Sequence, residues 1–146
     1  MSEKDRERRI REHIQKDPFA VMLNASTEIV SPGHARVTMT VTDDMCNFHG
    51  TIHGGIIFTI CDIAFGASCN SHGRTAVAMD VNINFIRATK PGDCLVAEAI
   101  EQYRGGKTGL YDITIKDTNS EKLVARFQGR AYLMDEWFVP ADENMG

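Results

Sequence analysis

The sequence predicts an α+β fold in which one antiparallel sheet curls around a single long central helix. Three observations carry this prediction: an apolar helical segment at 54–70, two extended segments before it and four strand-like segments after it. The chain has 146 residues, 42% of them hydrophobic, which suffices for one core and is too little for two full domains.

The first residues, 3–16, mix acidic and basic side chains with an apolar pair, Ile10 and Ile14, at the i,i+4 spacing of a helix face. We expect a short surface helix that ends before Pro18. The chain then divides into an N-terminal helical extension (1–18), one domain (19–134) and an acidic C-terminal tail (135–146). The tail contains neither Lys nor Arg and is expected to be loosely held.

Two extended segments, at about 24–31 and 34–42, surround the turn sequence Ser31-Pro32-Gly33. In the second segment apolar side chains alternate with polar ones at Ala35, Val37, Met39 and Val41. This alternation predicts a hairpin with one buried face. The next segment, 43–54, has no hydrophobic period and predicts a loop of functional length.

The segment 54–70 is apolar on almost every helical face, which predicts a buried helix. Beyond Gly73, turn sequences at 90–93, 104–107 and 117–120 separate four expected strands, and the first strand should bury its apolar residues on one face. Curling the sheet around the helix buries such a helix best, and this arrangement is the hotdog fold. One curled sheet leaves helix surface and edge strands uncovered, so we expect a homodimer that assembles further into a homotetramer.

Composition excludes several functional classes. A formal net charge of −4 provides no field that would gather nucleic acid or an anionic membrane. No apolar run approaches the ~20 residues that cross a bilayer, and the first residues lack the apolar core of an export signal. The four cysteines form no CxxC pair. We therefore expect a cytoplasmic protein with reduced thiols.

Asp62 is the single charge between Gly54 and Ser71. A carboxylate in apolar surroundings costs several kcal/mol unless it is paired or faces a cleft. Two explanations stand at this point: a hydrogen-bonded structural Asp at a subunit contact, or a catalytic carboxylate.

The residues His53, Gly54 and Gly55 open the same helix, where backbone N–H groups and a partial positive charge are exposed. Such donors suit the oxyanion that forms when a carbonyl is attacked, although glycines that only make a tight turn are the alternative. Asn47 offers a donor and an acceptor for orienting water or a carbonyl, or else it stabilises a turn.

His49 and His53 have the spacing H-x-x-x-H, which is found in metal sites on helices. The glycines at 50 and 54 argue against a helix there, and no third ligand is well spaced. We expect these histidines to shape the loop, with His53 also able to lie over a reacting carbonyl, and we expect no metal.

Residues 47–55 (NFHGTIHGG) resemble the phenylacetate-degradation (PaaI) family of hotdog acyl-CoA thioesterases. The resemblance includes Asp62, the strand 79–85 and the turn 90–93, and it spans about residues 19–133. It implies hydrolysis of phenylacetyl-CoA or hydroxyphenylacetyl-CoA type thioesters in aromatic (phenylacetate) catabolism, without a cofactor.

The resemblance also implies residue roles. Asp62 would be the nucleophile or general base, Gly54 the main oxyanion donor with help from Gly55, and Asn47 the group that positions water or the thioester. The site would lie in a dimer cleft, where the helix start of one subunit faces Asp62 of its neighbour. Ala78 stands where a related branch has a serine that holds the attacking water, so a mechanism that needs this serine is not expected.

The CoA moiety of such a substrate is a polyanion. We expect Lys90, Arg104 and Lys107 to meet its phosphates, with Arg87 as a further candidate. Two alternatives stay open: a hotdog acyl-CoA hydratase or dehydratase that uses His53 and Asp62 for proton transfer, and a non-catalytic acyl-CoA-binding module.

Overall fold

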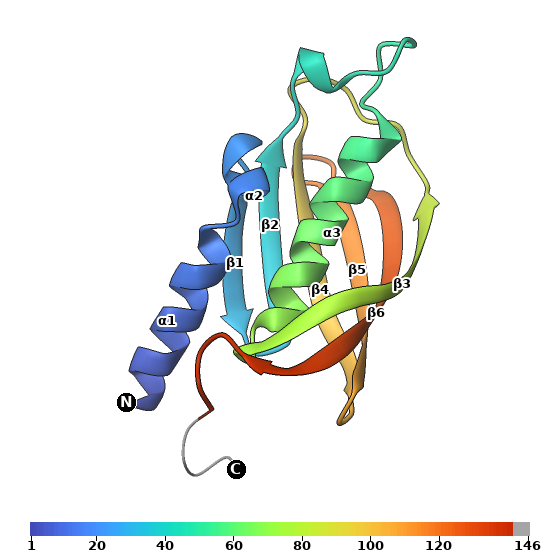
Figure 1. Cartoon of the computed structure of the whole chain (residues 1–146). Helices are drawn as coiled ribbons and strands as arrows, with labels where there is room; N and C mark the ends of the chain where they lie inside the picture. The colour runs from blue at the N-terminus through green and yellow to red at the C-terminus, as the bar shows by residue number, and fades with distance from the viewer. Residues whose placement is uncertain (142–146) are drawn as a thin grey trace.

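Six strands form one antiparallel sheet that wraps around a central helix in the computed structural model, which describes residues 1–141 (Figure 1). The helices are α1 (Glu3–Gln15), α2 (Pro18–Met22) and α3 (Gly54–Asn70), and a 3-10 turn covers Asp43–Met45. The strands are β1 (Ser26–Ser31), β2 (His34–Thr40), β3 (Arg74–Phe85), β4 (Cys94–Arg104), β5 (Thr108–Asp117) and β6 (Leu123–Trp137). Their order in the sheet is β1-β2-β4-β5-β6-β3. The predicted hotdog fold is confirmed.

Helix α3 begins and ends where the apolar segment of the sequence does. Its buried residues face the sheet and join the main core with β2, β4, β5 and β6; they include Ile57, Ile60, Cys61, Ala64 and Phe65. The opposite side of the helix is not covered by the sheet, and Asp62 on that side is exposed. Within a single chain, α3 is therefore buried as predicted only on the side that faces the sheet.

The alternating pattern of β2 is confirmed, because Ala35, Val37 and Met39 are all almost completely buried. The expected burial of β3 is observed only in part: Val81 and Ile83 are half-buried against the core, whereas Val77 is 46% exposed and Met79 is 55% exposed. β3 is an edge strand, and its register with β6 shifts between Ala78 and Asp80, so the residues before the shift do not continue the alternation of those after it.

Helix α1 lies beside the segment that follows β6. Helix α1 places Ile10 in contact with the fold at 3% exposure, and the ring of His13 stacks on Phe138 with a centroid distance of 4.7 Å. The short helix α2 was not expected from the sequence; the side chain of Asp17 caps it by accepting a hydrogen bond from the Phe19 N–H at 3.3 Å.

The expected acidic tail is partly built into the fold. Strand β6 continues to Trp137, past the predicted domain end at 134, and Val139 is 3% exposed. The N–H groups of Phe138 and Val139 both donate to the carbonyl of Gly73. The prediction of a loosely held tail is therefore wrong for residues 135–139, while its last part, 142–146, lies outside the described residues.

The four cysteines form no disulfide: Cys61 and Cys69 are buried, and Cys46 and Cys94 are half-buried. Among residues 1–141 no helix has the length and apolar character that a membrane crossing requires.

Candidate active site

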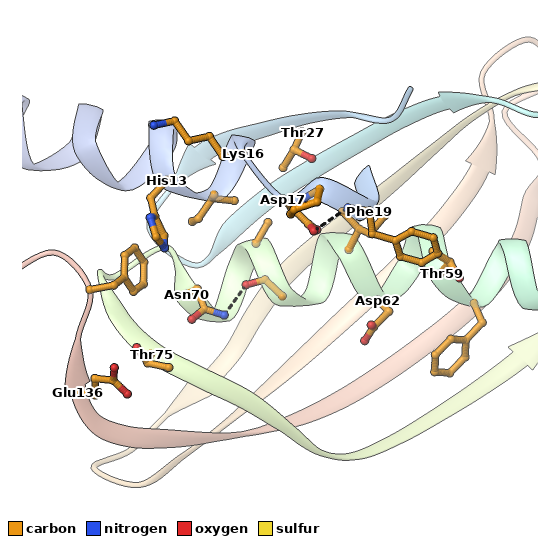
Figure 2. A pocket seen from close by; sticks show the side chains of 17 residues that line it. His13, Lys16, Asp17, Phe19, Thr27, Thr59, Asp62, Asn70, Thr75 and Glu136 are labelled. Atoms are coloured by element: carbon orange, nitrogen blue, oxygen red, sulfur yellow. Dashed lines mark hydrogen bonds between the residues drawn. The ribbon is translucent and has the colours of Figure 1, made fainter. Parts of the chain in front are cut away.

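Asp62 lies in a groove of about 910 Å³ that runs along the uncovered side of α3 (Figure 2). The floor is formed by helix residues, including Phe58, Asp62 and Gly66. One wall is the N-terminal segment from His13 to Phe19, and the other comprises the start of β3 and the end of β6, with Thr75, Glu136 and Phe138. The groove therefore joins the catalytic candidate to parts of the chain that are far away in sequence.

The carboxylate of Asp62 has no hydrogen-bond or ion-pair partner among residues 1–141. Although Asp62 reaches solvent, the protein atoms around its carboxylate in the groove partly desolvate it and raise its pKa above the ordinary value, and the negative charge of Asp17 raises this pKa further. A structural Asp would be expected to have a partner, so the hydrogen-bonded explanation finds no support within one chain. The neighbouring thiol of Cys61 is an unsuitable nucleophile, because burial raises its pKa to about 12.

The start of α3 has one backbone donor to offer. His53 is the N-cap residue, and its Nδ1 accepts a hydrogen bond from the Gly55 N–H at 2.9 Å. The N–H groups of Ile56 and Ile57 donate to the His53 carbonyl. Within residues 1–141 the Gly54 N–H has no acceptor, so Gly54 is the available oxyanion donor and the Gly55 N–H is already engaged.

The side chain of Asn47 is committed to its own loop. Its Oδ1 accepts from the N–H groups of His49, at 2.9 Å, and Thr51, at 3.3 Å, while its Nδ2 donates to the Thr51 hydroxyl at 3.1 Å. Gly50 closes the same turn with a φ of 81°. This is the turn-stabilising arrangement that an Asn favours, and it holds the loop that leads into His53.

The two histidines of the loop, His49 and His53, have different structural roles. His49 is exposed and lies beside the ring of Phe48, with a centroid distance of 4.1 Å, whereas His53 caps the helix. Across residues 1–141 no cluster of three His, Cys, Asp or Glu side chains has the arrangement of a metal site.

Gly54 and Asp62 of one chain cannot act on the same carbonyl. They are eight residues apart on a continuous helix, which places them about 12 Å apart along its axis. Gly54 instead lines a smaller pocket of about 290 Å³ with Phe85, Ile86 and Arg87. A single chain thus holds two half-sites at different heights of α3.

The basic residues expected to bind CoA are not brought together within one chain. Lys90 lies in the turn after β3, close to the helix start, since the Thr89 carbonyl accepts from the Ile52 N–H at 2.9 Å. Arg104 lies at the other end of the 17-residue helix, about 25 Å away, in a pocket with His72, and Lys107 follows in the same hairpin. Arg87 lies closer to Gly54 than Arg104 and Lys107 do, because Arg87 and Gly54 line the same pocket.

Sequence reasoning missed the N-terminal wall of the groove. The spacing of Ile10 and Ile14 indicated that α1 packs on the fold, but no local signal indicated that His13, Lys16 and Phe19 would line the groove that contains Asp62. The groove is lined by residues more than forty positions apart in sequence, and only the folded chain reveals it.

Comparison with known proteins places the chain in a family. The thioesterase superfamily model matches residues 49–124. A putative esterase of Archaeoglobus fulgidus is 37% identical over 133 residues, which cover 90% of this chain and 86% of that protein. The acyl-coenzyme A thioesterase PaaI of Escherichia coli is 41% identical over 118 residues, which cover 81% of this chain and 84% of that protein.

Solved structures agree with these relatives. The structure of the Escherichia coli PaaI protein from the phenylacetic acid degradation operon has a TM-score of 0.87 at 36% identity, covering 93% of this chain and 99% of that one. A hypothetical thioesterase from Streptococcus pneumoniae, solved with coenzyme A, has a TM-score of 0.72 at 28% identity, covering 76% of this chain and 89% of that one. The family match, the relatives and the shared fold show that the chain belongs to the thioesterase superfamily.

Proposed function

We propose that this protein is an acyl-CoA thioesterase that hydrolyses phenylacetyl-CoA or hydroxyphenylacetyl-CoA type substrates to free CoA and the acid, in aromatic (phenylacetate) catabolism. One observation carries the proposal: in a chain of the thioesterase superfamily, the carboxylate of Asp62 has no partner among residues 1–141 and lies in a groove large enough for an acyl group. The similarity to PaaI supports the choice of substrate class.

The proposed site is shared between two copies of the chain. The Gly54 N–H of one subunit would polarise the thioester carbonyl and stabilise the oxyanion, while Asp62 of the other would act as base toward water or as nucleophile. The distance of about 12 Å between these residues along one helix favours this arrangement over a site within one chain. The exposed apolar residues of edge strand β3, including Val77 and Met79, offer a surface for the required dimer, which we expect to form a tetramer.

The remaining residues of the proposal have supporting roles. Asn47 would hold the loop in shape and thereby fix the position of the Gly54 donor. Arg87 and Lys90, near the helix start, are our candidates for contacts with CoA phosphates within the same subunit, whereas Arg104 and Lys107 would have to act from another one. A cytoplasmic location, where CoA esters are formed and used, remains part of the proposal.

The test is a panel of thioesters from acetyl-CoA to phenylacetyl-CoA and hydroxyphenylacetyl-CoA, with detection of the free thiol. The wild-type protein should release CoA fastest from the aromatic esters, and Asp62→Asn should lose the activity. Asp112→Asn is the matched control, because Asp112 lies on a strand of the sheet and bonds only Gln128 through its side chain among the described residues. Thiol release that stays flat while CoA esters raise Tm would indicate a binding module. Loss of enoyl absorbance without thiol would indicate a hydratase.

A further inference from the structure

Gly66 occupies a position where the fold of one chain does not require a glycine. It lies in the interior of α3, its φ is not in the left-handed region, and a Cβ at this position would meet no neighbouring side chain or other element within 4 Å among the described residues. Glycine is the poorest helix former after proline, because its backbone loses the most conformational freedom. The helix therefore carries a local disadvantage at Gly66 that packing does not explain.

The neighbours of Gly66 show what its missing side chain leaves open. Phe58, Asp62, Gly66 and Asn70 follow one another at i,i+4 spacing along the groove side of α3. The ring of Phe58 is held against Phe127 in an edge-to-face contact, with a centroid distance of 5.4 Å, and Phe58 lines the groove one helical turn before Asp62.

Asn70 is the last of these four residues on the groove side of α3, and hydrogen bonds hold its side chain in place. Its Nδ2 donates to the carbonyls of Gly66, at 2.8 Å, and Ala76, at 3.1 Å, and its Oδ1 accepts from the Ala76 N–H at 2.9 Å. Figure 2 shows the bond from Asn70 to the Gly66 backbone, and a Cβ at Gly66 would have no neighbouring side chain or other element within 4 Å among the described residues. The side chains of Phe58 and Asn70 are thus both held in place by contacts of their own. The part of the groove between them stays open because Gly66 has no side chain.

We infer that Gly66 is a specificity-determining residue that makes room for a bulky acyl group, such as a phenylacetyl group, beside Asp62. This inference rests on the proposed thioesterase function. A thioester carbonyl within reach of Asp62 must direct its acyl group along the groove, where the bulky Phe58 lines one side of Asp62 and Gly66, without a side chain, lines the other. The acyl group then lies over Gly66, with the N-terminal segment around Phe19 as the opposite wall.

The experiment compares Gly66→Ala and Gly66→Val with wild type on acetyl-CoA and phenylacetyl-CoA. In Gly66→Ala, kcat/KM for phenylacetyl-CoA should fall by about tenfold or more, because even one methyl group in a pocket discriminates at this level, while acetyl-CoA hydrolysis stays within about twofold. Gly66→Val should widen this difference. The Tm of Gly66→Ala should rise by about 2–4 °C, since alanine is the better helix former. A glycine needed only for folding would give a lower Tm.

Gly106→Ala is the matched control, because a Cβ at Gly106 also meets no heavy atom within 4 Å and Gly106 lies in the distant hairpin between β4 and β5. It should leave the ester preference unchanged. An unchanged ester preference in both Gly66 variants would overturn this inference and leave the proposed function standing. An equal loss of activity on both esters would do the same. Dissociation of the oligomer in these variants would also overturn it, because Gly66 would then be a subunit contact. A wild-type protein that hydrolyses no ester would instead refute the proposed function and the inference with it.

Discussion

Asp17 and Asp62 line the same groove from two different elements, and the charge of Asp17 contributes to the raised pKa of Asp62. Asp17 is fixed in place as the cap of α2, so its charge is a stable part of the environment of Asp62. The base form of Asp62 is therefore harder to populate than that of an ordinary Asp.

This relationship predicts a shift in the pH profile. Activity that needs ionised Asp62 should fall as pH falls through its pKa. Removing the negative charge in Asp17→Asn lowers that pKa, so the acidic limb of log kcat/KM should move to lower pH, and added salt should weaken this effect. Lys16 also lines the groove, so removing its positive charge in Lys16→Gln should move the acidic limb in the opposite direction, to higher pH. An acidic limb that stays in place in Asp17→Asn would contradict the electrostatic coupling.

Replacing Asp62 should have opposite effects on activity and stability. Asp62→Asn should reduce kcat by about 10²–10⁴-fold, as expected for the loss of a base. The pKa of Asp62 is raised in the folded state, so its contribution to stability is present below the ordinary pKa and is lost as pH rises through the folded pKa. Thermal unfolding should therefore show a higher Tm for Asp62→Asn than for wild type at pH 7, and this difference should shrink toward pH 3. A lower Tm for the variant at pH 7 would point to a structural role for Asp62.

Mixing two impaired variants, each affected in a different part of the proposed site, tests whether the site is shared. Asp62→Asn subunits and Asn47→Ala subunits, unfolded and refolded together, form dimers in which one of the two sites has both residues intact. If the site spans two subunits, random mixing should restore about a quarter of the wild-type activity above the level of the variants alone. A mixture that is no more active than its components would place Asp62 and the loop in a site within one chain. Refolded wild-type protein provides the reference value.

Asn47→Ala should act through the loop, because its side chain bonds His49 and Thr51. We expect a smaller loss of kcat than in Asp62→Asn, with faster hydrogen exchange of the amides between Cys46 and Ile52. Thr51→Val removes one partner of Asn47 and should show the same exchange effect more weakly. Unchanged exchange together with a large loss of kcat would mean that Asn47 contacts the substrate or the water directly.

The parts of the molecule that could be predicted from sequence are those that depend on local periodicity. The bounds of α3 follow from an uninterrupted apolar run, and the burial of β2 follows from its alternation. The exposure of Val77 on β3 could not be predicted, because the same alternation occurs whether a strand is covered by its own chain or left at an edge.

Some features of the candidate site could likewise be predicted from the sequence, and others could not. Asp62 and Gly54 are visible in the sequence as a lone charge and a glycine pair at a helix start. The engagement of the Gly55 N–H by His53 depends on the ring orientation of the cap, and the position of Arg104 depends on which end of the sheet its hairpin occupies. Neither property is encoded in residue spacing alone.

The groove has one wall that belongs to the N-terminal extension and a floor that belongs to the central helix. The N-terminal extension should tolerate mutation better than the central helix does. Helix α3 packs in the main core, whereas α1 and α2 contact the sheet mainly at its edge strand β1. During divergence, residues 1–22 can therefore be exchanged between relatives without disturbing the groups that carry out the reaction. Chimeric proteins with exchanged N-terminal segments offer a modular route to new ester preferences on an unchanged catalytic helix.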